Sequence, residues 1–206
     1  MLDLWPFWKG LGIGLAVAAP VGPVGLLCIR RSLACGWLSG FLSGLGAAVA
    51  DAVYAAIAAF GLTTLTSWLV ASQDWIAPIG GVLLIWIGIG IWHSKPGDRG
   101  AAPVDTAGLA ADFATTLAVT MTNPATILSF VALFAGFGLG TASDYGAATL
   151  LTVGTFLGSA LWWLFLSNAS GWARRYATDG RLVWVNRVAG AIIVAFGLWG
   201  ISAGIR

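Results

Sequence analysis

The chain has 206 residues, of which 59% are apolar and only 9% are charged, and it contains no glutamate. A soluble domain of this length needs far more charge to cover its surface, so the composition excludes a soluble globular protein. It indicates an integral membrane protein with little mass outside the bilayer. The net charge is +2, and no basic patch interleaved with aromatic residues points to a nucleic-acid partner.

Six apolar segments are each long enough to cross the hydrocarbon core of a bilayer as a helix, which takes about 20 residues. Their ranges are 10–29, 35–62, 76–92, 113–139, 146–169 and 188–205. The connections are short except for residues 94–112, a polar segment rich in glycine, proline and alanine that we expect to form a loop. The sequence therefore predicts an all-α polytopic membrane protein with one transmembrane domain over residues 1–206. The loop divides it into two halves, about 10–93 and about 113–206, of three helices each.

The basic residues indicate how these six helices are oriented. Eight of the ten lie in the loops that follow the first, third and fifth segments, and the other two are Lys9 and Arg206. Loops rich in lysine and arginine stay on the cytoplasmic side of a membrane. We therefore expect the odd-numbered loops to be cytoplasmic and both termini to face outward. The second half then crosses the membrane with the opposite orientation to the first.

The first apolar segment contains two prolines, Pro20 and Pro23, separated by Val21 and Gly22. Each proline lacks a backbone N–H and clashes with the preceding turn, so each leaves a carbonyl without its helical partner. In lipid, a break of this kind must be buried in protein or line a polar cavity. Broken helices near the bilayer midplane carry the binding sites of many transporters. Pro20, Gly22 and Pro23 are therefore candidate site residues.

A second break is expected in the fourth segment, at Asn123 and Pro124. Alanine–valine pairs precede both breaks, and small residues recur in the second and fifth segments, which favours two inverted three-helix repeats. Helices 1 and 4 would then be broken at their prolines, although a simple proline kink is the alternative. Two interpretations of Asn123 and its hydroxyl-bearing neighbours stay open. They satisfy the carbonyls that Pro124 releases, or they coordinate a carboxylate or ammonium group in a cavity.

Asp51 is an acidic residue near the centre of the second segment, among alanine and valine neighbours. An acid at the bilayer centre costs about 2.5–3.5 kcal/mol on insertion scales, so its side chain must face a partner or a cavity. Since removal from water favours the neutral acid, Asp51 is a candidate proton carrier. It is also a candidate counter-ion for a substrate ammonium. The alternative is a structural acid hydrogen-bonded to another helix, with Tyr54, one turn away, as a local partner.

The remaining polar residues have simpler interpretations. Arg30 and Arg31 are expected to anchor the first helix at cytoplasmic headgroups, with a role in attracting anionic groups as the alternative. Cys28 and Cys35 do not form a C-x-x-C pair and are expected to be inert, and His93 has no partner at metal-ligand spacing. No phosphate-binding loop, nucleophile elbow or zinc motif occurs. The sequence therefore predicts no metal site, no cofactor and no enzymatic activity.

Two motifs closely resemble those of the lysine exporter (LysE) family. The first is Ala19-Pro20-Val21-Gly22-Pro23, followed later by Ala50-Asp51-Ala52-Val53-Tyr54, and the second is Thr122-Asn123-Pro124-Ala125-Thr126. The resemblance covers nearly the whole chain and places Pro20, Gly22, Pro23, Asp51, Asn123 and Pro124 at the family's signature positions. It implies a bacterial inner-membrane exporter of amino acids or related small solutes, driven by the proton gradient or the membrane potential. The common family form of the first motif is Pro-Gly-Pro, whereas Val21 is an extra residue here, and Ala125 stands where many members have lysine.

The sequence thus predicts a secondary exporter whose site lies between the two broken helices, Asp51 and the adjacent Tyr54. Its expected partners are a small solute and the lipid bilayer, and self-association into a homo-oligomer stays open. One alternative is export of a metal cation or another small ion, against which the few carboxylates argue. A less favoured one is a membrane oxidoreductase that passes electrons through Cys28 and Cys35. A third, a purely structural membrane subunit, predicts that Asp51 is dispensable.

Overall fold

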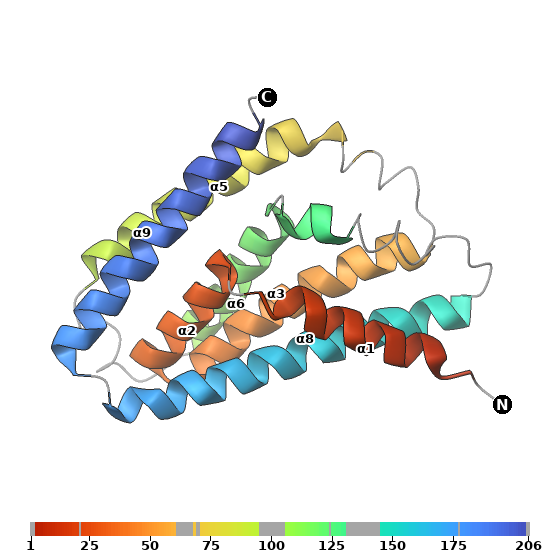
Figure 1. Ribbon diagram of the computed structural model, residues 1–206, viewed down its shortest axis with the longest axis horizontal. Coiled ribbons are helices and arrows are strands. Elements are labelled where there is room, and N and C mark those ends of the chain that lie inside the picture. The colour runs from red at the N-terminus through yellow and green to blue at the C-terminus, as the bar shows by residue number, and fades with distance from the viewer. Residues whose placement is uncertain are drawn as a thin grey trace.

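The computed structural model describes residues 3–20, 22–60, 68, 71–94, 106–123, 125–130, 145–176 and 178–204. Within these ranges the chain is helical and contains no strand, which confirms the all-α prediction. The elements, shown in Figure 1, are α1 (Trp5–Ala18), α2 (Pro23–Cys35), α3 (Trp37–Ala59), α5 (Gln73–His93), α6 (Thr106–Met121), α8 (Tyr145–Ala173), the short 3-10 helix η1 (Arg174–Tyr176) and α9 (Asp179–Gly204).

Four stretches of helix in the described part of the chain are long and apolar enough to cross a membrane. They are Trp37–Ala59, Asp74–His93, Tyr145–Tyr176 and Gly180–Ser202. A fifth span results if α1 and α2 are the two halves of one broken helix. The predicted segment 113–139 runs beyond the described residues, and its described part consists of the end of α6 and the helical residues 125–130. The chain is therefore a multi-pass helical membrane protein.

The predicted loop at residues 94–112 is too long at its C-terminal end, because α6 already begins at Thr106. Residues 106–112 contain three alanines and a leucine, which are strong helix formers. Asp112, the polar residue that ends this stretch, is not exposed to solvent, because its side chain is buried. Its partner, described below, explains why this polar residue belongs to the helix.

One group of helices is α5 with α9, the other is α1 with α3 and α8, and α2 and α6 lie between the two groups (Figure 1). α5 packs chiefly against α9, and this pair lies along one edge of the molecule. α1 packs against α8, and α3 packs against both α8 and α6. α2 touches both groups, because it contacts α3 and α8 on one side and α9 on the other.

Glycines permit close contact between the backbones of paired helices. Between α1 and α8, a Cβ atom added at Gly14 or Gly158 would overlap backbone atoms of the partner helix. Between α5 and α9, Gly81 lies against the carbonyl of Gly197, and Gly197 lies against the carbonyl of Gly81. Helix association in membranes depends on such close van der Waals packing, since lipid tails are as apolar as the side chains.

Substitution of Gly81 by valine is expected to destabilise the α5–α9 pair. The added side chain would overlap the backbone of Gly197, and overpacking of this kind costs about 1–3 kcal/mol. Gly90→Val is the matched control, because Gly90 is exposed on the same helix and a Cβ atom there meets no neighbouring atom within 4 Å. Thermal unfolding of the detergent-purified variants measures the difference. Equal loss of stability in both variants would contradict the packing described.

Candidate functional site

Asp51 lies in the interior of α3, where only 2% of its surface is exposed. The hydroxyl Oγ of Ser159, on α8, donates a hydrogen bond of 2.7 Å to Asp51 Oδ2. Ser159 in turn accepts a hydrogen bond of 3.1 Å from the indole Nε1 of Trp163, one turn further along α8. The three side chains form a buried chain of hydrogen bonds between two helices. It includes Ser159 and Trp163, two residues that the sequence reading missed because they lie in an otherwise ordinary apolar segment.

This arrangement gives Asp51 a partner in either protonation state. A carboxylate accepts a hydrogen bond from the Ser159 hydroxyl, and a neutral carboxylic acid can instead donate to the same oxygen, because a hydroxyl is both donor and acceptor. The indole of Trp163 can only donate, so it occupies one lone pair of Ser159 Oγ and leaves the other for Asp51. The geometry is therefore compatible with a carboxyl group that gains and loses a proton without becoming unpaired.

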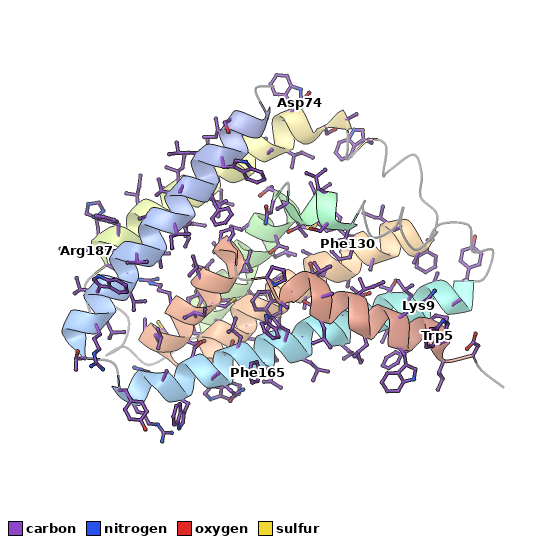
Figure 2. All side chains as sticks on the ribbon, in the orientation of Figure 1. Trp5, Lys9, Asp74, Phe130, Phe165 and Arg187 are labelled. Atoms are coloured by element: carbon purple, nitrogen blue, oxygen red, sulfur yellow. The ribbon has the colours of Figure 1, made fainter. Side chains whose placement is uncertain are left out.

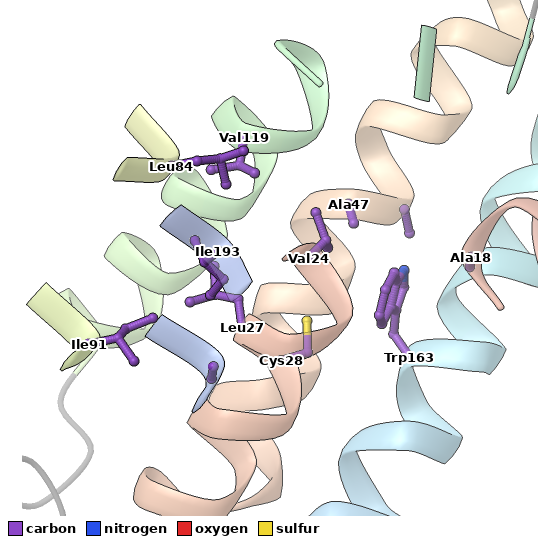
Figure 3. Close-up of a cluster of buried hydrophobic side chains, with 12 residues drawn as sticks. Ala18, Val24, Leu27, Cys28, Ala47, Leu84, Ile91, Val119, Trp163 and Ile193 are labelled. Carbon is purple, nitrogen blue, oxygen red and sulfur yellow. The ribbon is translucent and has the colours of Figure 1, made fainter. Parts of the chain in front are cut away.

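The first proline-containing segment lies beside this chain of hydrogen bonds. α1 ends at Ala18 and α2 begins at Pro23, with Gly22 as its N-cap, while Val21 lies outside the described residues. Ala18 and Val24, on either side of this segment, belong to one buried cluster with Ala47 and Trp163 (Figure 3). Ala47 lies one turn before Asp51 on α3, and Trp163 lies one turn after Ser159 on α8. The ends of α1 and α2 thus share a buried cluster with neighbours of Asp51 and Ser159, and Gly14 of α1 lies against the backbone of Ser159.

Asn123 caps a helical segment. α6 ends at Met121, and the Asn123 side-chain oxygen accepts a hydrogen bond of 3.1 Å from the backbone N–H of Ala125. Its backbone oxygen accepts from the N–H groups of Thr126 and Ile127. In these contacts Asn123 satisfies backbone N–H groups and not carbonyls, whereas the Thr122 hydroxyl donates to the carbonyls of Ala118 and Val119. Pro124 itself lies outside the described residues.

Tyr54 is not the local partner that the alternative interpretation of Asp51 suggests. Its hydroxyl donates to the backbone oxygen of Met121, at the end of α6, and its ring lies 5.7 Å from that of Phe130. The spacing of one helical turn brings Tyr54 near Asp51, but the side chain extends toward a different helix. Tyr54 therefore connects α3 to the second proline-containing segment. Both proline-containing segments therefore have buried neighbours on α3 within one turn of Asp51.

A second buried polar cluster lies at the opposite end of α2. Arg31 Nε forms an ion pair of 3.0 Å with Asp112 Oδ1, and both residues are almost fully buried. Arg31 Nη1 also donates to the hydroxyls of Ser43 and Thr116, and Ser39 donates to Asp112 Oδ2. The interpretation of Arg31 as an anchor at lipid headgroups is therefore wrong. The signal that could have identified this cluster is Asp112, an acidic residue adjoining an apolar segment.

Arg30 also has partners within the protein. It donates hydrogen bonds to the side chains of Asn186, on α9, and Ser94, at the end of α5. Cys28 and Cys35 are both free thiols, and Cys28 is fully buried. The ring nitrogen Nδ1 of His93 is 2.9 Å from the backbone oxygen of Ile89. Among the described residues, no three histidine, cysteine or acidic side chains are grouped as metal ligands.

Comparison with known proteins identifies the family. Residues 15–202 match the family described as LysE type translocator. The chain belongs to this family of translocators. The "Uncharacterized membrane protein YahN" of Escherichia coli (strain K12) is 32% identical to it, over 95% of this chain and 89% of the relative. The "Leucine efflux protein" of Salmonella typhimurium (strain LT2) is 25% identical, over 95% of this chain and 93% of the relative. No solved structure matches this LysE type translocator significantly.

Replacing Asp112 by asparagine is expected to destabilise the protein strongly. Loss of one partner of a buried ion pair leaves the other charge uncompensated, which costs about 3–5 kcal/mol. Asp74→Asn removes an exposed carboxylate at the start of α5 and serves as the control. Thermal stability in detergent provides the measurement, and a double variant, Arg31→Met with Asp112→Leu, should recover much of the loss. An Asp112→Asn protein as stable as the Asp74→Asn protein would be inconsistent with a buried ion pair.

Proposed function

We propose that this LysE type translocator is a secondary exporter of amino acids or related small solutes across the bacterial inner membrane. The observation that carries the proposal is the buried carboxyl group of Asp51, contacted by Ser159 and flanked by the two proline-containing segments. Intramembrane acids are costly and are functional by default in membrane proteins. Membership of a translocator family, and a relative whose name describes leucine efflux, support an amino acid as the solute.

We assign the coupling step to Asp51. Its hydrogen-bond partner accommodates both the charged and the neutral carboxyl group, as coupling to a proton gradient requires. In this mechanism a proton from outside binds Asp51, is released on the cytoplasmic side, and solute moves in the opposite direction. The N-terminus of α2, at Gly22 and Pro23, carries a partial positive charge from the helix dipole and would orient the carboxylate of the solute.

The six-helix architecture with inverted repeats is part of the same proposal. Exchange of the two halves maps α1 onto α6, α3 onto α8, and α5 onto α9. The α1–α8 contact then maps onto the α6–α3 contact, and both occur. The α5–α9 contact maps onto itself, which agrees with the reciprocal approach of Gly81 to Gly197 and of Gly88 to Gly190. In the proposed topology the odd-numbered loops are cytoplasmic, both termini face outward, and helices 1 and 4 are broken at their prolines.

The direct test is transport into inside-out membrane vesicles that carry the overproduced protein. In these vesicles export appears as uptake, and each of the 20 common amino acids is offered in radiolabelled form with an imposed proton gradient. We expect gradient-dependent uptake of at least one amino acid, absent from control vesicles. If the vesicles take up a radiolabelled metal cation and none of the amino acids, the result would instead support the alternative of an ion exporter.

Asp51→Asn is expected to abolish gradient-driven uptake while the protein inserts into the membrane in normal amount. The amide has the size of the carboxyl group but cannot exchange a proton. Ser159→Ala should reduce uptake by about 10-fold, the factor for loss of a hydrogen bond to a charged group, and Ser159→Thr should restore it. Asp74→Asn is the control for loss of a carboxylate elsewhere. Normal uptake by the Asp51→Asn protein would exclude the role proposed for this residue.

A further inference from the structure

Two adjacent arginines at the C-terminal end of α2 connect that helix to different neighbours. Arg31 contacts α6 through the buried ion pair with Asp112, and it contacts α3 through a hydrogen bond to Ser43. Arg30 contacts the α5–α9 pair. Its Nε donates to Asn186 Oδ1 over 3.2 Å, and its Nη2 donates to Ser94 Oγ over 2.7 Å. The side-chain nitrogen of Asn186 donates to the backbone oxygen of Ser94, so each of the three residues is hydrogen-bonded to the other two.

Beyond this cluster, apolar side chains line the contact between α2 and the α5–α9 pair. Leu27 of α2 belongs to the same buried cluster as Leu84 and Ile91 of α5 and Ile193 of α9 (Figure 3). Apolar contacts are not directional, so they do not by themselves fix the relative position of the two surfaces. The hydrogen bonds of Arg30, Ser94 and Asn186 supply directional contacts at one end of this interface.

The two arginine clusters differ in how readily they separate. Arg31 is buried and paired with a carboxylate, and breaking such a pair inside the protein is strongly unfavourable. Arg30 is only partly buried, and its hydrogen bonds to Ser94 and Asn186 join it to neutral groups that water can replace. Breaking the hydrogen bonds from Arg30 to Ser94 and Asn186 therefore costs less than breaking the buried ion pair between Arg31 and Asp112.

We propose that the Arg30–Ser94–Asn186 cluster is a latch that closes the interface between α2 and the α5–α9 pair at the end of the molecule assigned to the cytoplasm. α2 extends from this latch to Pro23, beside Asp51 and Ser159. Opening of the latch exposes the face of α2 that carries Leu27 and gives a solute access toward Asp51. The nature of the solute rests on the proposed function, whereas the latch is a property of the helices and can be tested without solute.

Cysteine alkylation measures the opening. Leu27 is 2% exposed, so a cysteine at this position should react slowly with N-ethylmaleimide while the latch is closed. The reporter protein carries Leu27→Cys with Cys28→Ser and Cys35→Ser. Addition of Arg30→Gln is expected to raise its alkylation rate by about 10-fold, the factor for loss of a hydrogen bond to a charged group. Asn186→Ala should raise the rate in the same direction, and Arg30→Lys, which keeps the charge and a donor, should stay close to the parent protein.

Two controls make the result specific. Arg187→Gln also removes one positive charge, but from the residue that follows Asn186 on α9. The Arg187 side chain is exposed at the outer edge of that helix (Figure 2), so this variant should leave the alkylation rate of Leu27→Cys unchanged. A protein with Cys28 as its single cysteine reports on general loosening of α2, and its alkylation should stay slow when Arg30 is replaced. The latch is excluded if Arg30→Gln and Asn186→Ala leave the Leu27→Cys rate unchanged, or if Arg187→Gln or the Cys28 reporter shows the same acceleration. If the alkylation rates support the latch but the protein exports no amino acid, only the proposed function is refuted.

Discussion

A carboxyl group surrounded by alanine side chains must find its hydrogen-bond partner within the protein, because the apolar core provides no water. Asp51 meets this requirement through Ser159, and the distance of 2.7 Å requires α3 and α8 to lie close together. Gly44 permits this approach, since a Cβ atom there would overlap the Trp163 side chain that hydrogen-bonds to Ser159. The polar chain and the close packing of the two helices therefore depend on each other.

The same requirement explains how the other elements are arranged around α3. Ala18 and Val24, near the facing ends of α1 and α2, share a buried cluster with Ala47, one turn before Asp51, and Tyr54 donates to the end of α6 one turn after it. Arg31 and Asp112 satisfy each other where α2, α3 and α6 meet. The buried charged or acidic side chains Asp51, Arg31 and Asp112 are thus each paired with a residue of another helix, while glycines permit close contact between helix backbones elsewhere. In the proposed mechanism this arrangement brings solute and proton to one place.

Much of the fold was predictable, because apolar segments long enough to cross a bilayer and two proline motifs are properties of the local sequence. The burial of Asp51 was predictable for the same reason. Its partner was not, because Ser159 is 108 residues away and nothing local distinguishes it from other serines in helices. The Arg31–Asp112 pair was missed because Asp112 adjoins a polar segment, which favoured a loop over the start of α6. Tyr54 shows the limit of spacing arguments, since a neighbour at one helical turn can still direct its hydroxyl to another helix. The inverted repeats and the break at Pro124 remain predictions.

Proton movement measured during solute transport tests the central claim most directly. The purified protein is reconstituted into liposomes that contain a pH-sensitive dye, and an amino acid that it exports is added without an imposed gradient. If Asp51 couples the two movements, the wild-type protein will change the internal pH when solute is added. The Asp51→Asn protein will still exchange labelled for unlabelled solute but will move no protons. A pH change of equal size in both proteins would contradict the account.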